Sequence, residues 1–146
     1  MSDFVAVLNG PNLNLLGQRQ PEVYGHDTLA DVERLCTETA ARFGMEARCL
    51  QSNHEGVILD AVHQWRTEAA GFVVNAGGWT HTSVALRDAL VTITGPLLEV
   101  HISNVHAREE FRHHSYLSPI ASGIIVGCGM QGYQFAVERI AALRGQ

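Results

Sequence analysis

Five short apolar runs alternate with five stretches of helical spacing in this chain, and this alternation limits the folds that it can adopt. The first run, residues 4–8, lacks an in-and-out pattern, which is typical of a strand buried on both faces of a sheet. Helices that connect successive parallel strands cover both faces of their sheet. The pattern therefore predicts an α/β fold with a parallel sheet, and 146 residues suit one domain over 1–146.

The expected elements follow from the apolar pattern and from the residues that end it. The strands are expected at residues 4–8, 45–50, 71–74, 95–100 and 120–126, and the polar second run suits a sheet edge. The first helix is expected from Asp27 or Thr28 to Phe43, and the second along Val57, Ile58, Ala61, Val62 and Trp65. The third is expected from Thr82 or Ser83 through Val84, Leu86, Ala89 and Leu90. A short helical piece is expected at Ala107–Phe111, and the last helix through Ala136, Val137, Ile140 and Leu143. A flavodoxin-like, five-stranded parallel sheet with helices on both faces is the version expected at this length.

Composition excludes several classes of protein. A net charge of −5 with only 10 Lys and Arg leaves no basic surface for nucleic acid, and no apolar run approaches the length of a membrane span. The N-terminal residues lack the pattern of a signal peptide. Three cysteines without CxxC spacing suit reduced, mostly buried thiols, so we expect a cytoplasmic protein.

Polar side chains gather where the expected strands end, whereas the strands themselves carry almost none. The residues at these ends are Asn12, Ser52, Asn53, His54, Asn75, His81, His101 and Ser103. Parallel strands bring their carboxyl ends to one edge of the sheet, which is where ligands bind in folds of this kind. The segregation therefore predicts a polar pocket at that edge.

The stretch from Glu99 to Asn104 concentrates proton-transfer groups at one strand end. Side chains alternate along a strand, so Glu99, His101 and Ser103 should point to the same face. A carboxylate beside an imidazole fixes its tautomer and increases its basicity, as in a proton-transfer site. A solvated polar face at a sheet edge is the alternative interpretation of this stretch.

Two other patterns favour structural roles. Gly127, Gly129 and Gly132 match the spacing of a dinucleotide fingerprint, but the chain ends before the further strand and acid that the fingerprint requires, so a tight turn is preferred. The eight histidines lack metal-ligand spacing, and His26, His63, His106, His113 and His114 suit surface or helix positions. Cys128 has no base beside it in the sequence, which favours a buried thiol over a nucleophile.

A loop between Gly17 and Gly25 carries Arg19 and Tyr24. A tyrosine acts as a base at neutral pH only where a positive charge stabilises its phenolate, and a guanidinium could supply part of that stabilisation. With no nucleophile elbow or P-loop present, the polar residues suit proton abstraction beside a carbonyl in an anionic, hydroxyl-rich substrate.

Four blocks of this sequence resemble the type II 3-dehydroquinate dehydratases (type II dehydroquinases). They are LNGPNLNLLGQRQPEVYG, QSNHEG, VVNAGGWTHTSVALRDAL and EVHISNVHAREEFRHHSYLSPIASGIIVGCGMQGY, and together they cover nearly the whole chain in the same order. The resemblance implies a flavodoxin-like, cytoplasmic enzyme that converts 3-dehydroquinate to 3-dehydroshikimate without a metal or cofactor. It also implies a homododecamer, and it leaves open a biosynthetic role in the shikimate pathway or a role in quinate breakdown.

The resemblance also implies a role for each matching position. Tyr24 would take the proton beside the ketone, Arg19 would stabilise the anionic transition state with Arg108 as a further candidate, and Asn12 would hold a water against the enolate oxygen. His101 would protonate the departing hydroxyl, and Glu99 would orient it. The implied substrate-binding residues are Asn75, His81, Asp88, Ile102, Ser103 and Arg112.

The chain departs from the family pattern at two positions. Ala76 stands where many members have proline, and Trp79 where many have tyrosine; neither change removes a polar group assigned to the chemistry. Two other functions remain as alternatives. A flavin- or nucleotide-binding module would need a phosphate-binding loop after the first strand, and a non-catalytic interaction protein would be expected to have lost Tyr24, His101 or Arg19.

Overall fold

A five-stranded, all-parallel sheet forms the centre of the computed structural model, which describes residues 3–145. The strands are β1 (Phe4–Asn9), β2 (Glu46–Gln51), β3 (Gly71–Asn75), β4 (Leu97–His101) and β5 (Gly123–Val126), in the order β2-β1-β3-β4-β5. This order is that of the flavodoxin-like fold, so the predicted fold class is confirmed, as is the edge position of the second strand. Residues 1, 2 and 146 of the predicted domain lie outside the described residues.

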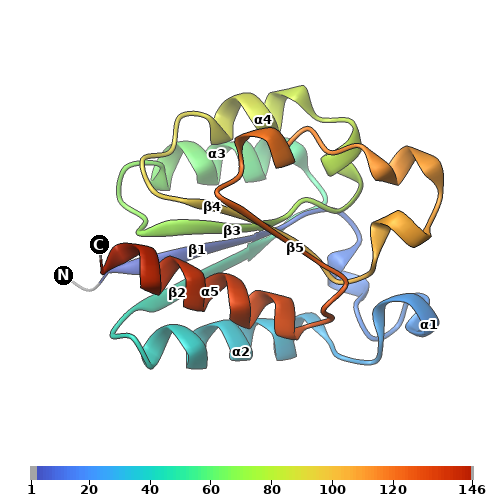
Figure 1. Ribbon diagram of the computed structural model, residues 1–146, viewed down its shortest axis with the longest axis horizontal. Coiled ribbons are helices and arrows are strands. Elements are labelled where there is room, and N and C mark those ends of the chain that lie inside the picture. The colour runs from blue at the N-terminus through green and yellow to red at the C-terminus, as the bar shows by residue number, and fades with distance from the viewer. Residues whose placement is uncertain (1–2, 146) are drawn as a thin grey trace.

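Two pairs of helices cover the sheet (Figure 1). Helices α2 (Leu29–Ala41) and α5 (Gln131–Arg144) share one apolar core with Val5, Val7 and their neighbours on that face. Helices α3 (Glu55–Trp65) and α4 (Val84–Leu90) share the other core with Phe4, Ala6 and Leu8. Alternate side chains of β1 enter the two cores, so both faces of this strand must be apolar. This explains its continuous apolar run.

Short polar side chains begin two of these helices near the expected residues. Thr28 accepts a hydrogen bond from the Asp31 backbone N–H, and Asp31 accepts one from the Thr28 N–H, which makes a reciprocal capping box. Ser83 accepts a hydrogen bond from the Leu86 N–H at the start of α4. Both caps satisfy backbone donors that a helix leaves unpaired in its first turn.

The predicted elements after β4 are wrong in detail. The expected helical piece Ala107–Phe111 is two 3₁₀ turns, Val105–Ala107 and Glu110–His113, because Arg108 between them has an extended backbone. The expected fifth strand begins at Gly123 rather than at residue 120. Its first part is a third turn, Ser118–Ile120, which includes a proline that cannot donate to a strand ladder.

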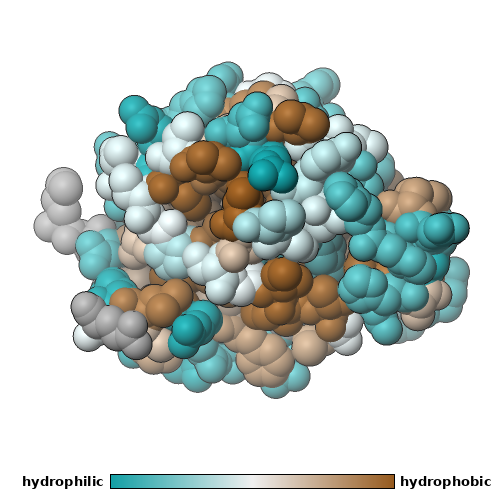
Figure 2. Space-filling view, turned by 45° about the horizontal axis from the view of Figure 1, so that its top comes forward, coloured by the Kyte–Doolittle hydropathy of each residue, from teal (hydrophilic) through white to brown (hydrophobic). Residues whose placement is uncertain are grey.

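Some apolar residues assigned to buried positions are exposed. Val57 and Val84 lie in first turns of their helices and are 43% and 51% exposed, and Phe43 beyond the end of α2 is also exposed. Cys128 is exposed too, which corrects the expected buried thiol, because it lies in a turn between two glycines with positive φ. Figure 2 shows several apolar patches within a largely polar face of the molecule.

The termini of the described chain and the carboxyl ends of the strands lie at opposite ends of the molecule (Figure 1). The connections that follow β1 and β4 are long and irregular, and the one after β1 includes the single helical turn α1 (Pro21–Tyr24). None of the helices in residues 3–145 is both long and apolar enough to cross a membrane.

Candidate active site

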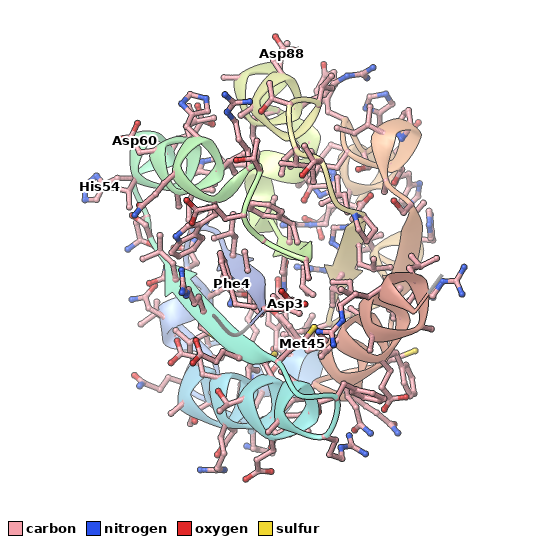
Figure 3. All side chains as sticks on the ribbon, turned by 90° about the vertical axis from the view of Figure 1, so that its left-hand side faces the viewer. Asp3, Phe4, Met45, His54, Asp60 and Asp88 are labelled. Carbon is pink, nitrogen blue, oxygen red and sulfur yellow. The ribbon has the colours of Figure 1, made fainter. Side chains whose placement is uncertain are left out.

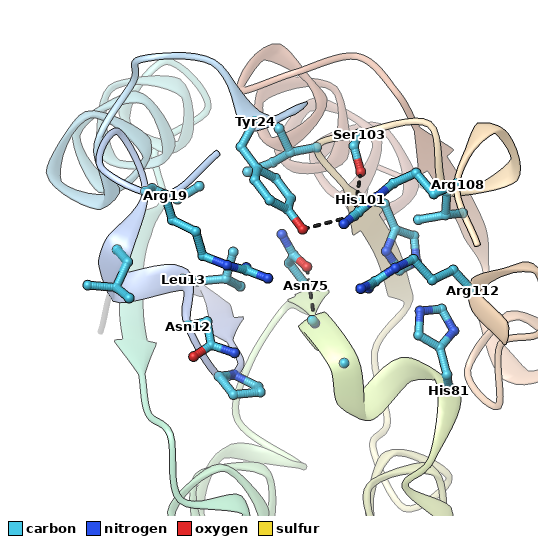
Figure 4. Close-up of a pocket in the computed structure, with 17 residues that line it drawn as sticks. Asn12, Leu13, Arg19, Tyr24, Asn75, His81, His101, Ser103, Arg108 and Arg112 are labelled. Atoms are coloured by element: carbon cyan, nitrogen blue, oxygen red, sulfur yellow. Dashed lines mark hydrogen bonds between the residues drawn. The ribbon is translucent and has the colours of Figure 1, made fainter. Parts of the chain in front are cut away.

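A cavity of about 130 Å³ lies beyond the carboxyl ends of β1, β3 and β4 (Figure 4). The neighbouring strands β1 and β3 connect in opposite directions across the sheet, so the cavity sits at the position expected for a ligand in this topology. The predicted site residues that line it are Asn12, Arg19, Tyr24, Asn75, His81, His101, Ile102, Ser103 and Arg112.

One wall of the cavity is the segment from Pro11 to Gly25, which we call the flap. Its backbone has a positive φ at Asn12, Gly17, Gln20 and Gly25, so it folds back on itself in tight turns. The Asn12 backbone N–H donates to Asn53 Oδ1 at 2.9 Å, which ties the start of the flap to the loop after β2. The predicted loop is therefore ordered by turns and contains the helical turn α1.

Tyr24 projects from the end of α1 toward the opposite wall, where it meets a guanidinium (Figure 4). Arg108 Nη1 donates to the Tyr24 hydroxyl oxygen at 2.8 Å and also to Ser103 Oγ at 3.3 Å. The guanidinium carbon of Arg19 lies 5.3 Å from the centre of the Tyr24 ring, over its face. Arg108 is thus the cation that touches the hydroxyl, whereas Arg19 contacts the ring.

The rim of the sheet holds His101 rigidly. His101 Nε2 donates to Glu99 Oε2 at 2.5 Å, and the two residues are 6% and 1% exposed. They are two positions apart on β4, so strand alternation brings them to one face, as the sequence predicts. The hydrogen bond leaves Nδ1 of His101 as the free nitrogen of the imidazole.

Two serines complete the surroundings of the Glu99 carboxylate. Ser118 Oγ donates to Oε1 at 2.6 Å and Ser115 Oγ donates to Oε2 at 2.8 Å. Burial opposes ionisation of Glu99, but the hydrogen bonds from His101, Ser118 and Ser115 outweigh it and lower the pKa of the carboxyl group. An ionised Glu99 accepts the Nε2–H of His101 and so fixes the tautomer of the ring.

Asn75 and His81 provide the floor and a further wall. Asn75 ends β3, and its Oδ1 accepts a hydrogen bond from the Gly77 N–H at 3.2 Å. His81 Nδ1 is 2.7 Å from the carbonyl oxygen of His114, so this nitrogen carries the proton and donates. Burial lowers the pKa of His81, which favours a neutral imidazole whose Nε2 can accept a hydrogen bond.

Two predicted site residues do not line the cavity. Glu99 lies behind His101 and acts on the cavity only through it. Asp88 lies on α4, is exposed and points outward from the molecule (Figure 3). Three residues that were not predicted also support the site: Ser115, Ser118 and Tyr133, whose contacts with Glu99 and Asn75 join residues 16 to 58 positions apart. Neither periodicity nor spacing signals such pairs.

The remaining motifs have structural roles. Within residues 3–145, no group of three or more His, Cys, Asp and Glu side chains is arranged to hold a metal ion. A Cβ atom at Gly132 would lie 3.2 Å from Ile125, so α5 packs closely against β5, in agreement with the tight-turn interpretation. All five histidines expected at surface or helix positions are exposed: His26, His63, His106, His113 and His114.

Comparisons with known proteins agree over nearly the whole chain. The family model described as dehydroquinase class II matches residues 3–141. The 3-dehydroquinate dehydratase of Cereibacter sphaeroides (strain ATCC 17029) is 59% identical over 143 residues, which are 98% of this chain and 97% of that protein. That of Variovorax paradoxus is 62% identical over 141 residues, 93% of this chain and 97% of that protein. The crystal structure of type II dehydroquinase from Propionibacterium acnes superposes with a TM-score of 0.90 at 40% identity, covering 97% of this chain and 98% of that one.

Proposed function

This chain belongs to the dehydroquinase class II family, and from that premise we propose that it removes water from 3-dehydroquinate to give 3-dehydroshikimate through an enolate intermediate. The reaction breaks a C–H bond beside a ketone and then a C–O bond, so it needs a base, stabilisation of an oxyanion and an acid. The hydrogen bond from Arg108 to the Tyr24 hydroxyl, in a cavity that His101 also lines, is the observation that carries the proposal.

Tyr24 is the base in this mechanism. A permanently charged guanidinium donates a hydrogen bond to its phenolic oxygen at 2.8 Å, so a positive charge lies beside the oxygen that takes the proton next to the ketone. Arg19 approaches the same ring from the flap and supports the developing negative charge. Closure of residues 18–25 over the bound substrate would exclude water and bring Arg19 nearer.

His101 is the acid that protonates the departing hydroxyl, which then leaves as water. The ionised Glu99 accepts from Nε2 and holds the ring, so that Nδ1 is left to donate to the substrate. Asn12, at the base of the flap, holds a water molecule against the enolate oxygen. After one turnover Tyr24 has gained a proton and His101 has lost one. Proton exchange with solvent restores both groups for the next turnover.

The other polar residues bind the substrate's carboxylate and hydroxyl groups. Arg112 supplies a cation for the carboxylate, and Asn75, His81, Ser103 and the Ile102 backbone offer hydrogen-bonding groups around the cavity. Asp88 keeps its proposed binding role only if α4 of another copy meets the cavity, because within one chain it points outward from the molecule.

The decisive experiment follows the conjugated enone of the product by ultraviolet absorbance, with 3-dehydroquinate as substrate and a chelator present. We expect turnover that the chelator leaves unchanged. Absence of the enone signal from folded protein would contradict the proposed reaction, and loss of activity with the chelator would contradict its independence from metals.

We further propose that the protein is cytoplasmic and assembles as a homododecamer, as the family resemblance implies. Exposed apolar side chains such as Phe111 and Val91, 62% and 60% exposed, support self-association. The mass of the purified protein by light scattering tests the assembly, and a monomer would contradict it. Growth of a strain without its own dehydratase, on minimal medium or on quinate, would separate a role in aromatic biosynthesis from one in quinate breakdown.

A further inference from the structure

Three polar side chains from three separate elements form a chain of hydrogen bonds beneath the cavity floor. The Tyr133 hydroxyl, in the first turn of α5, donates to Asn9 Oδ1 at 2.6 Å. Asn75 Nδ2 in turn donates to the Tyr133 oxygen at 2.8 Å. Tyr133 is fully buried, and Asn9 and Asn75 are 1% and 4% exposed, so water does not compete for these bonds.

The direction of this chain fixes the Asn75 amide. A phenol has one proton, and Tyr133 gives it to Asn9, so toward Asn75 its oxygen can only accept. Rotating the Asn75 amide by half a turn would bring Oδ1 against that oxygen with no proton between them, and would turn Nδ2 toward the Gly77 N–H. Burial raises the pKa of Tyr133, so the phenol keeps its proton throughout the neutral range.

We propose that Tyr133 is a positioning residue, whose hydroxyl sets the orientation of the Asn75 amide so that its second N–H points into the cavity. Asn75 then offers a donor to an acceptor oxygen of the substrate, such as a hydroxyl or carboxylate oxygen. This inference rests on the proposed function for the identity of the substrate, but the fixed amide is a property of the free protein. Without the Tyr133 hydroxyl, only the Gly77 N–H still opposes rotation of the Asn75 amide, so the orientation that presents an acceptor to the ligand becomes more accessible.

The kinetic test is a double-mutant cycle between Tyr133 and Asn75. Tyr133→Phe removes one oxygen and keeps the ring, and we expect it to raise KM for 3-dehydroquinate about tenfold with kcat within about threefold. In an Asn75→Ala background the same change should alter KM less than about twofold, because the group that Tyr133 positions is gone. An equal factor in both backgrounds would assign Tyr133 a structural role only and overturn the proposal.

Tyr116→Phe is the matched control, because it removes a phenolic oxygen from a half-buried ring whose hydroxyl makes no hydrogen bond within the described residues. Its KM should equal that of the unchanged protein. If Tyr133→Phe does not fold, Asn9→Ala carries the same test: it removes the acceptor that uses the Tyr133 proton, which frees that proton for either orientation of Asn75. KM should then rise in the same direction, and an unchanged KM would contradict the proposal.

A measurement without substrate separates this inference from the proposed function. In nitrogen-15 spectra of the free protein, the side-chain amide protons of Asn75, assigned by their absence in Asn75→Ala, should be protected from exchange and should lose protection in Tyr133→Phe. Protection that survives the substitution would overturn the positioning role. Protection that is lost in a protein that does not turn over 3-dehydroquinate would support that role and reject the proposed reaction.

Discussion

The two walls of the cavity are held in different ways. The sheet rim positions His101 through Glu99, which is almost fully buried and accepts hydrogen bonds from three side chains. The flap carries Tyr24 and Arg19, both half-exposed, and within the described residues the only hydrogen bond of the Tyr24 hydroxyl comes from Arg108 across the cavity. The proposed acid is therefore fixed by the fold, whereas the proposed base is positioned by one contact that spans the site.

This difference suits the order of events in the proposed reaction. Residues 18–25 of the flap include no buried side chain, so this part can open for substrate and product at little cost, whereas Leu13 and Leu16 nearer β1 belong to the apolar core. A buried carboxylate is costly unless its donors are complete, so the rim cannot move without losing them. The comparison predicts that changes in the flap alter activity with little effect on stability, and that changes in the rim alter both.

Tyr24→Phe should give the largest effect on activity. It removes the proposed base and leaves the ring in place, so kcat should fall by roughly 10²- to 10⁴-fold while the thermal unfolding midpoint stays nearly constant. The measurement is the enone assay beside a calorimetric scan. A near-normal rate would reject Tyr24 as the base.

Arg108→Met tests which guanidinium supports the base. Arg108 touches the Tyr24 hydroxyl and is mostly buried, so its loss should lower kcat by roughly 10- to 100-fold, the range for a hydrogen bond to a charged group. Arg19→Met is the matched variant, and it should have a smaller effect because Arg19 lies over the ring face. If Arg19→Met is the more damaging change, the flap must rearrange on binding so that Arg19 replaces Arg108.

The two walls also differ in how far sequence alone predicts them. Apolar runs predicted the five strands of a parallel sheet, and the two-residue spacing of Glu99 and His101 predicted their contact, because both follow from local periodicity. The choice between Arg19 and Arg108 as the partner of the Tyr24 hydroxyl could not be predicted, since it depends on a contact across 84 positions. The same holds for Tyr133 and Asn75, 58 positions apart. The direction of Asp88 could not be predicted either. Helical spacing shows which side chains share a face of α4, but not whether the polar face lies toward the cavity.

Glu99→Gln tests how the sheet rim is held, through the pH dependence of the stability of the fold. The folded-state pKa of Glu99 is lowered from an ordinary value of 4.5, so the ionised form stabilises the fold above about pH 4.5, and this stabilisation is lost as the pH falls through the folded-state pKa. The variant should be less stable at pH 7 by roughly 1–3 kcal/mol, because an amide hydrogen faces groups that donate. Its stability should then fall less steeply below pH 4.5 than that of the unchanged protein.

The control for this pH dependence is Glu46→Gln, which neutralises an exposed carboxylate on the edge strand β2. Its denaturant unfolding curves at pH 7 and pH 3 should parallel those of the unchanged protein. With Glu99→Gln, kcat should also fall about tenfold, since His101 loses the carboxylate that fixes its tautomer and orients its ring. Equal acid sensitivity of the Glu99→Gln variant and the unchanged protein would mean that Glu99 is not ionised in the folded state.

Gly25→Ala should give the smallest effect on activity. Together with Gly44→Ala, it compares the flap with a turn between α2 and β2. Gly25 ends α1 beside Tyr24, with φ 80° and ψ −170°, a region that only glycine adopts readily, and a Cβ atom there would meet nothing within 4 Å. The flap can relieve the strain by shifting, so kcat/KM should fall about threefold with little change in stability. Gly44→Ala imposes a similar positive φ between α2 and β2, where the next residue, Met45, is buried, and should cost about 1 kcal/mol of stability with activity intact. Denaturant titrations and the enone assay measure the stability and the activity of both variants. Equal losses of stability at the two positions would mean that the flap is held as firmly as the turn between α2 and β2.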